Sequence, residues 1–239
     1  MRRYAKQLAW LGTAALCYVT AISSAEASIT QVSSSAGFGS ALTVNWGIFG
    51  AVPGTVSTFA SAPVGTLTVG INTASGALNL ANGSAVGGFL PTDTLLSQSP
   101  GNLSDPILVD FSTPVQGVGT QIESLLAGAF TGILDLYDSG NHLLGEVTVT
   151  ATTTALNDGS APFIGAISTS ADIDHIVFSV NNGNPDFPKA GDVAINGLAI
   201  ARAVPEPTSL GLLGAALAGL AFLIRRRERR SDGDMRSFV

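Results

Sequence analysis

Glycine, proline and short turn sequences interrupt the middle of this chain so often that no long helix fits there. The chain contains 28 Gly and 11 Pro in 239 residues. Turn-forming stretches such as residues 138–141 (DSGN) and 157–159 (NDG) separate short apolar runs, and Val147-Thr148-Val149-Thr150 alternates with a period of two. Similar runs cover residues 42–46, 66–71, 107–111, 130–137, 173–180 and 193–200. We therefore predict an all-β fold for residues 28–203, an antiparallel β-sandwich of jelly-roll type.

Two details of this domain remain less defined. The run Ile122-Glu123-Ser124-Leu125-Leu126 is the one place where a short helix fits, over residues 121–126, although a loop fits equally well. His142 falls in a predicted hairpin turn. His175 falls in an alternating strand, where we expect its side chain to face solvent.

The first 27 residues have the three parts of a secretory signal peptide. Arg2, Arg3 and Lys6 precede an apolar run over residues 8–22, and Ala25-Glu26-Ala27 is a small-x-small site before Ser28. An uncleaved membrane helix is the alternative, but the run is shorter than the ~20 residues that usually span a bilayer. We predict a signal helix over residues 1–27 and cleavage by signal peptidase between Ala27 and Ser28. Because Cys17 is the single cysteine, the mature chain then has no disulfide.

Charge is divided unevenly along the chain. Residues 28–203 contain two basic and twelve acidic residues, a net charge of −10, whereas the other nine basic residues lie in the two terminal segments. A domain this acidic repels nucleic acid, which we exclude as a partner. Basic residues that flank apolar runs are typical of membrane topology signals.

No set of residues in the domain forms a recognisable catalytic motif. Asp135 and Asp138 flank a hairpin, and Asp172 and Asp174 are two residues apart in a strand. Such pairs could serve a glycan hydrolase or bind a structural calcium ion, so Asp135 and Asp138 are our candidate metal ligands. Solvated turns and strand ends explain them better than either site does. We expect no catalytic residue and no cofactor apart from this calcium alternative.

The C-terminal segment has three consecutive parts. Pro205, Glu206 and Pro207 favour an extended chain, which is the form that proteases bind. An uncharged run follows over residues 208–224, about 25 Å long as a helix. Arg225, Arg226, Arg227, Arg229 and Arg230 then hold the end in the cytoplasm, together with residues 231–239. We predict a single, short transmembrane helix with the β domain outside.

These three parts, in this order over residues 204–230, resemble the PEP-CTERM sorting signal of Gram-negative bacteria. The resemblance implies recognition by exosortase, a membrane-embedded cysteine transpeptidase that cuts near the Pro-Glu-Pro. It also implies export through an inner-membrane intermediate to the cell surface or the exopolysaccharide matrix.

The β domain is similar to the β-sandwich passengers of such proteins, over residues 111–119, 134–145, 163–168, 173–180 and 192–200. Those relatives carry an Asp-Asn pair in the last strand. This chain has Ile195-Asn196 there, which weakens the transfer of a binding role to that site.

Together these features favour a non-catalytic, exported protein with a structural or adhesive role in the envelope or biofilm matrix. A module that binds carbohydrate, such as exopolysaccharide, or calcium is the first alternative. A glycan hydrolase that uses Asp pairs is the second.

Overall fold

The computed structural model describes residues 28–39, 41–56, 59–73, 77–98, 105–183 and 192–202, together with Leu217. The chain divides into two compact units, residues 1–202 and 203–239. All the elements described below belong to the first unit.

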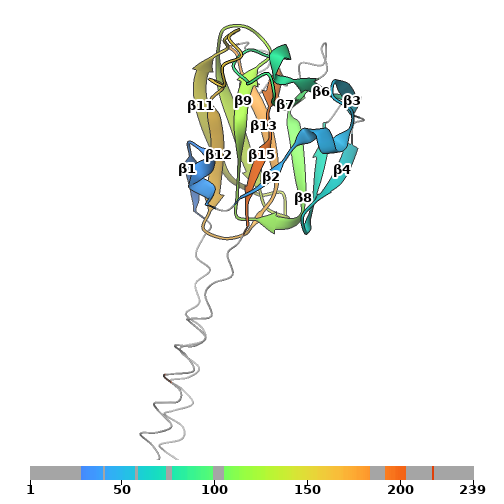
Figure 1. The fold of residues 1–239 in the computed structure, drawn as a ribbon. Coiled ribbons are helices and arrows are strands. Elements are labelled where there is room, and N and C mark those ends of the chain that lie inside the picture. Colours follow the sequence, from blue (N-terminus) through green and yellow to red (C-terminus); the bar gives the residue numbers. More distant parts are fainter. Residues whose placement is uncertain are drawn as a thin grey trace, which may run out of the picture. The chain divides into compact units, whose positions relative to one another are not determined.

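The described strands form two antiparallel sheets, which confirms the predicted all-β fold (Figure 1). The larger sheet has nine strands in the order β1-β12-β9-β14-β7-β6-β3, and β15 joins it by pairing with both β9 and β2. Its strands are β1 (Ile29–Val32), β2 (Ala41–Val44), β3 (Gly54–Val56), β6 (Leu78–Asn82), β7 (Thr94–Gln98), β9 (Gly117–Ser124), β12 (Phe163–Ser168), β14 (Val193–Ile195) and β15 (Leu198–Ala201).

The smaller sheet has six strands in the order β11-β10-β13-β8-β5-β4. They are β4 (Phe59–Val64), β5 (Leu67–Asn72), β8 (Ile107–Val115), β10 (Ala129–Tyr137), β11 (Leu143–Thr152) and β13 (Ile173–Asn181). Short 3₁₀ turns interrupt the connections at Ser35–Phe38, Trp46–Phe49 and Gly83–Ala85.

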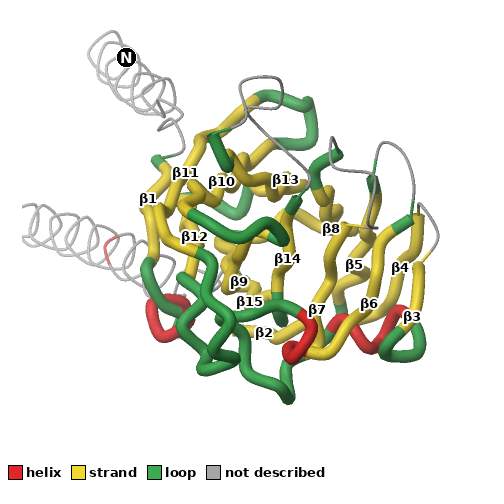
Figure 2. Tube along the Cα trace, turned by 90° about the horizontal axis from the view of Figure 1, so that it is seen from above, coloured by secondary structure: helices red, strands yellow, loops and turns green. Residues whose placement is uncertain are grey.

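The two sheets lie as two layers when the domain is seen along its strands (Figure 2). Alternate residues of each strand point into the space between them, because successive side chains of a strand face opposite sides. Trp46, Phe178, Ile71, Leu96 and Leu134 are among the side chains that are completely buried. The sheets therefore share one apolar core, as expected for a sandwich.

The edges of the sheets carry features that oppose pairing with other chains. The edge strand β4 contains Pro63, which has no backbone N–H to donate. On the other side, the side chain of Gln31 on β1 donates to the carbonyl of Thr148 on β11 over 2.9 Å. This bond links the edge strands of the two sheets.

One sequence expectation is wrong. Residues 121–124 form the end of strand β9 and not a helix. Thr120, Ile122, Glu123 and Ser124 are all buried and Gln121 is half-buried, so this part of the strand is covered on both faces of the sheet. Pairing of β9 with β12, β14 and β15 outweighs the local preference of Glu, Ser and Leu for a helix.

A polar cluster holds the break between β14 and β15. The side-chain Oδ1 of Asn196 accepts the backbone N–H of Gln121 (3.1 Å), and its Nδ2 donates to Gln121 Oε1 (2.6 Å). The Asn196 carbonyl accepts bonds from the indole Nε1 of Trp46 and from Thr120 Oγ1. Asn196 Nδ2 also lies 3.5 Å from Asp93 Oδ2. We call these five residues the Asn196 node.

The node predicts the effect of removing one hydroxyl. Thr120 is completely buried, and its Oγ1 lies 2.9 Å from the Asn196 carbonyl and 3.1 Å from Asn196 Oδ1. The variant Thr120→Val keeps the shape of the side chain but lacks the donor, so we expect a loss of about 1–2 kcal/mol in the free energy of unfolding. Urea denaturation followed by Trp46 fluorescence measures it.

Thr150→Val is the matched control, because Thr150 lies exposed on β11. We expect this change to alter stability by less than about 0.5 kcal/mol. Equal denaturation midpoints for the two variants would contradict the structural role of the node.

Candidate functional site

The predicted processing residues lie outside the described part of the structure. This applies to the signal cleavage residues Ala25 and Ala27, to Pro205, Glu206 and Pro207, and to the arginines at positions 225–230. Ser28, the predicted first residue of the mature chain, lies directly before β1. Within the described residues, no helix combines the length and the apolar character needed to cross a membrane.

The two candidate metal ligands have different surroundings. Asp135 lies in β10 and is 3 % exposed. Asp138 lies in the predicted hairpin turn, where the backbone N–H groups of His142 and Gly140 donate to its Oδ1, each over 2.8 Å. The bond from His142 holds the pKa of the Asp138 carboxyl below its usual value. Asp138 therefore stabilises the turn. The described residues contain no group of three or more His, Cys, Asp or Glu that could hold a metal ion.

A row of chemically active side chains crosses the outer face of the six-stranded sheet. The strand registers place Tyr137 opposite His175, His175 opposite Asp110 and Asp110 opposite Gly70. Their strand neighbours Leu136, Ile176 and Val109 lie in the core, so the row faces outward. Phe59 on the edge strand β4 extends the row, and its side chain is 60 % exposed.

The centre of this row is a stacked pair. The rings of Tyr137 and His175 are nearly parallel, with centroids 4.9 Å apart and an interplanar angle of 2°. His175 Nδ1 lies 3.4 Å from Asp174 Oδ2. His175 lies on the outer face of the sheet, as expected, but its side chain is only 12 % exposed. The cause is the tyrosine on the neighbouring strand, which covers the ring.

Electrostatics distinguish Asp110 within the row. Burial raises the pKa of its carboxyl, the nearby His175 opposes this shift, and Asp174 adds to it. A carboxylate that is partly removed from water binds a hydrogen-bond donor more strongly than a fully solvated one. The sequence contained one signal for this residue, a single acidic position inside the apolar run 107–111.

A second unusual carboxylate lies on the nine-stranded sheet. Glu123 is 2 % exposed, its Oε1 accepts the backbone N–H of Thr154 (3.1 Å), and its Oε2 has no hydrogen-bond partner. Gly88, with a φ of +90°, lies against this oxygen, and a methyl group there would come within 2.4 Å of it. The Gly88 carbonyl accepts the Ala161 N–H. Glu123 thus lies beneath the junction of two surface loops.

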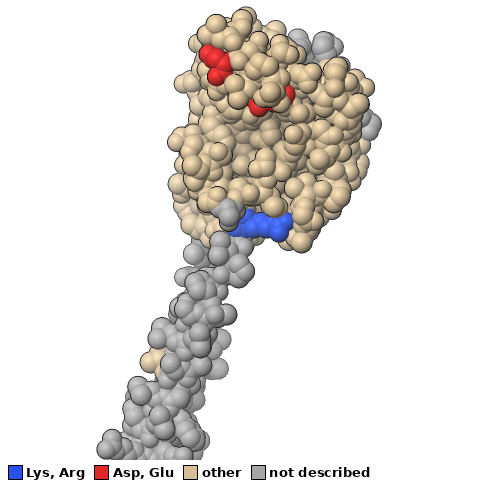
Figure 3. Space-filling view, in the orientation of Figure 1, with Lys and Arg blue, Asp and Glu red and all other residues tan. Residues whose placement is uncertain are grey.

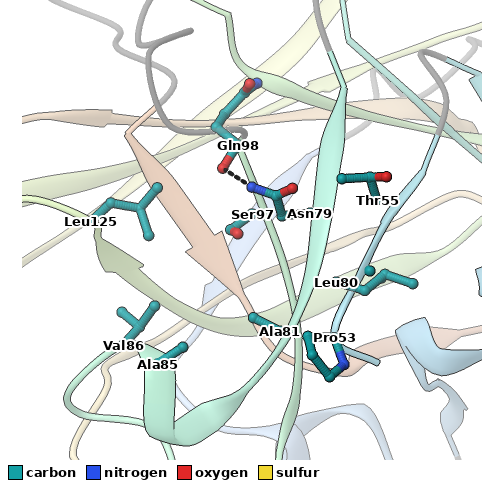
Figure 4. A pocket seen from close by; sticks show the side chains of 11 residues that line it. Pro53, Thr55, Asn79, Leu80, Ala81, Ala85, Val86, Ser97, Gln98 and Leu125 are labelled. Carbon is teal, nitrogen blue, oxygen red and sulfur yellow. Dashed lines mark hydrogen bonds between the residues drawn. The ribbon is translucent and has the colours of Figure 1, made fainter. Parts of the chain in front are cut away.

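A hollow lies on the nine-stranded sheet near β3, β6 and β7 (Figure 4). Its volume is about 560 Å³. Thr55, Asn79 and Ser97 provide polar groups, and Val86 and Leu125 are among its apolar walls. Asn79 Nδ2 donates to the Gln98 carbonyl over 3.2 Å, while the Gln98 side chain points away from the hollow. The lining residues carry no charge.

Few charged groups are visible on the face shown in Figure 3. Arg202 is the one Lys or Arg among the described residues of the domain. Charged side chains are therefore sparse on this face of the domain.

Comparison with known proteins bears mainly on the end of the chain. Residues 203–227 match the model of the PEP-CTERM protein-sorting motif, which confirms the resemblance described above. No curated protein matches the chain.

Solved structures show distant similarity. A DUF4465 family protein from Bacteroides caccae aligns at 8 % identity with a TM-score of 0.42, over 73 % of this chain and 100 % of that chain. CsCBM6-3 from Clostridium stercorarium, solved with cellobiose, aligns at 15 % identity (TM-score 0.31, 55 % and 87 %). A family 29 carbohydrate-binding module aligns at 12 % identity (TM-score 0.31, 72 % and 98 %). Similarity at this level assigns no function to the chain.

Glu123 makes the stability of the domain depend on pH. Burial raises the pKa of the Glu123 carboxyl from 4.5 to about 7, although the hydrogen bond from the Thr154 backbone N–H lowers it. The folded state therefore holds more protons than the unfolded state between these values, and the free energy of unfolding falls as pH rises from 4.5 to 7. Burial shifts the pKa of Asp110 and Asp192 in the same direction. Urea midpoints measured at pH 5 and pH 8 report the effect.

We expect Glu123→Gln to reduce this pH dependence, because glutamine does not ionise. Glu146→Gln removes an exposed carboxylate from β11 and serves as the control. If Glu123→Gln loses stability with rising pH as steeply as the parent chain and the control variant do, the ionisation of Glu123 is not the cause of the pH dependence.

Proposed function

Because the chain carries a PEP-CTERM sorting motif behind a β passenger domain, we propose that it is an exported protein processed by exosortase and sorted to the cell surface or exopolysaccharide matrix. The motif match over residues 203–227 is the observation that supports this function. The proposed organisation is a signal peptide over residues 1–27, the β domain over 28–203, the sorting signal over 204–230 and a cytoplasmic tail over 231–239.

In this proposal, the β domain has a structural or adhesive role and no catalytic one. Two of its acidic side chains fit this assignment. Asp138 is engaged in its hairpin turn, and Glu123 lies buried beneath two loops. Neither arrangement supplies the pair of accessible carboxyl groups that hydrolysis of a glycosidic bond uses.

A carbohydrate- or calcium-binding module is the second candidate. The row from Phe59 to Tyr137 favours carbohydrate, because it combines an exposed aromatic ring with hydrogen-bonding groups. Calcium binding is tested by comparing the melting temperature of the domain in calcium and in a chelator. A cation that binds only the folded state raises the melting temperature of the protein. An identical melting temperature in both solutions would reject the calcium assignment.

Processing by exosortase predicts a change in mass at the C-terminus. We expect the chain from cells with exosortase to lack the apolar run and the arginines, whereas the chain from cells without the enzyme retains them. Mass spectrometry of the intact protein measures the difference. It also reports whether the mature chain begins at Ser28.

Replacement of Pro205, Glu206 and Pro207 by alanine should give the unprocessed mass in both hosts. Pro188→Ala changes a proline outside the motif and should leave processing intact. An unprocessed C-terminus on the parent chain in both hosts would contradict the proposed function.

A further inference from the structure

An exposed aromatic ring and a partly buried carboxylate meet beside Gly70. A methyl group at Gly70 would lie 3.5 Å from Asp110 Cβ, 3.7 Å from Asp110 Oδ2 and 3.8 Å from Phe59 Cε2. The missing side chain therefore lets the ring of Phe59 and the carboxylate of Asp110 approach the same point. We call these two side chains the Phe59–Asp110 site.

Packing alone accounts for part of this arrangement. An aromatic ring that covers a glycine on the neighbouring strand protects the exposed backbone there. However, Phe59 is 60 % exposed, so much of the residue faces solvent instead of the sheet. The remaining area is a flat apolar platform at the edge of the domain.

The surroundings of the platform carry hydroxyl groups. Ser61 lies opposite Gly70 in the register of β4 and β5, and Ser61, Thr68 and Ser112 are exposed. Ser112 Oγ accepts the backbone N–H of Thr68 over 2.9 Å, which fixes its position. A ligand on the platform would therefore meet hydroxyl groups around the ring and the Asp110 carboxylate beside it.

Charge selects among the ligand classes. Asp110 and Asp174 lie in or beside this row, and Arg202 is the single Lys or Arg in the described domain. An anionic ligand would meet repulsion here. A neutral sugar fits, because the C–H face of its ring packs on an aromatic ring and its hydroxyls donate hydrogen bonds to a carboxylate.

We propose that the Phe59–Asp110 site binds a neutral sugar unit of a polysaccharide, with the ring stacked on Phe59 and adjacent hydroxyls bonded to Asp110. His175, whose ring stacks on Tyr137, lies opposite Asp110 on the strand next to it, on the side away from Gly70. This inference deepens the carbohydrate alternative above and rests on it.

Affinity electrophoresis of the full chain tests the proposal. The chain has a net charge of −6 and migrates toward the anode. Each native gel contains one neutral polysaccharide: a β-glucan, a mannan, a xylan or a dextran. The chain is kept in solution with a polyoxyethylene detergent, because a sugar-based detergent could compete for the site. We expect at least one of these neutral polysaccharides to retard the parent chain.

Variants then locate the binding surface. We expect Phe59→Leu, which keeps an apolar side chain but removes the ring, to weaken binding at least about fivefold, and Asp110→Asn to weaken it about tenfold or more. Phe59→Trp should retain binding because it restores a stacking surface. Leu156→Ala, at a leucine that is 71 % exposed on another loop, is the control and should bind as the parent does.

Three outcomes would overturn the proposal. One is that no neutral polysaccharide retards the chain, and another is that only an acidic polysaccharide such as alginate does. The third is unchanged binding by Phe59→Leu and Asp110→Asn variants whose melting temperatures match the parent. The C-terminal mass measured with and without exosortase is independent of all three, so failure of this site is distinguishable from failure of the sorting function.

Discussion

The fold of the β domain depends on how a single asparagine satisfies the break between two strands. At Asn196 the chain stops pairing with β7 and begins to pair with β2, while β9 continues beside both segments. A break in the middle of a sheet leaves backbone groups that must find other partners. Asn196 supplies two of these partners. Its side-chain Oδ1 accepts the backbone N–H of Gln121, and its backbone carbonyl accepts the indole N–H of Trp46 from the core. Contacts that span 75 to 150 residues of sequence therefore converge on one residue, through its side chain and its backbone carbonyl.

Local patterns in the sequence identified much of this domain. The hairpin at residues 138–141 was readable because Asp138 and Asn141 are turn residues, and Asn141 has a φ of 61°. The alternation Val147-Thr148-Val149-Thr150 correctly predicted a strand there, which is β11. In the same way, the sorting signal was readable because its proline motif, apolar run and arginines follow one another directly in the sequence.

Features that arise from pairing between distant strands could not be predicted. Residues 121–124 form a strand because β9 has neighbours on both sides, and their local composition does not show this. His175 is covered by Tyr137, and Asp110 lies beside Gly70, only because of the register of four strands. Likewise, nothing near Glu123 in the sequence indicates that Gly88 and Thr154 enclose it. A one-residue change of register would separate these groups.

The division of charge connects the fold with the proposed function. The domain is acidic and almost free of basic residues, so attraction to anionic lipid headgroups does not hold it at a membrane. The basic residues lie in the terminal segments that, in our proposal, direct export and processing. A passenger of this kind depends on its sorting signal for its location. The domain can then contact a hydrated matrix through hydroxyl, amide and aromatic groups.

The most direct test of this account is the location of the β domain in cells that produce the protein. Fractions of inner membrane, cell surface and extracellular matrix are compared between a strain with exosortase and one without it, using an antibody against residues 105–183. We predict that the domain reaches the surface or matrix in the first strain and stays with the inner membrane in the second. The same distribution in both strains would contradict the account.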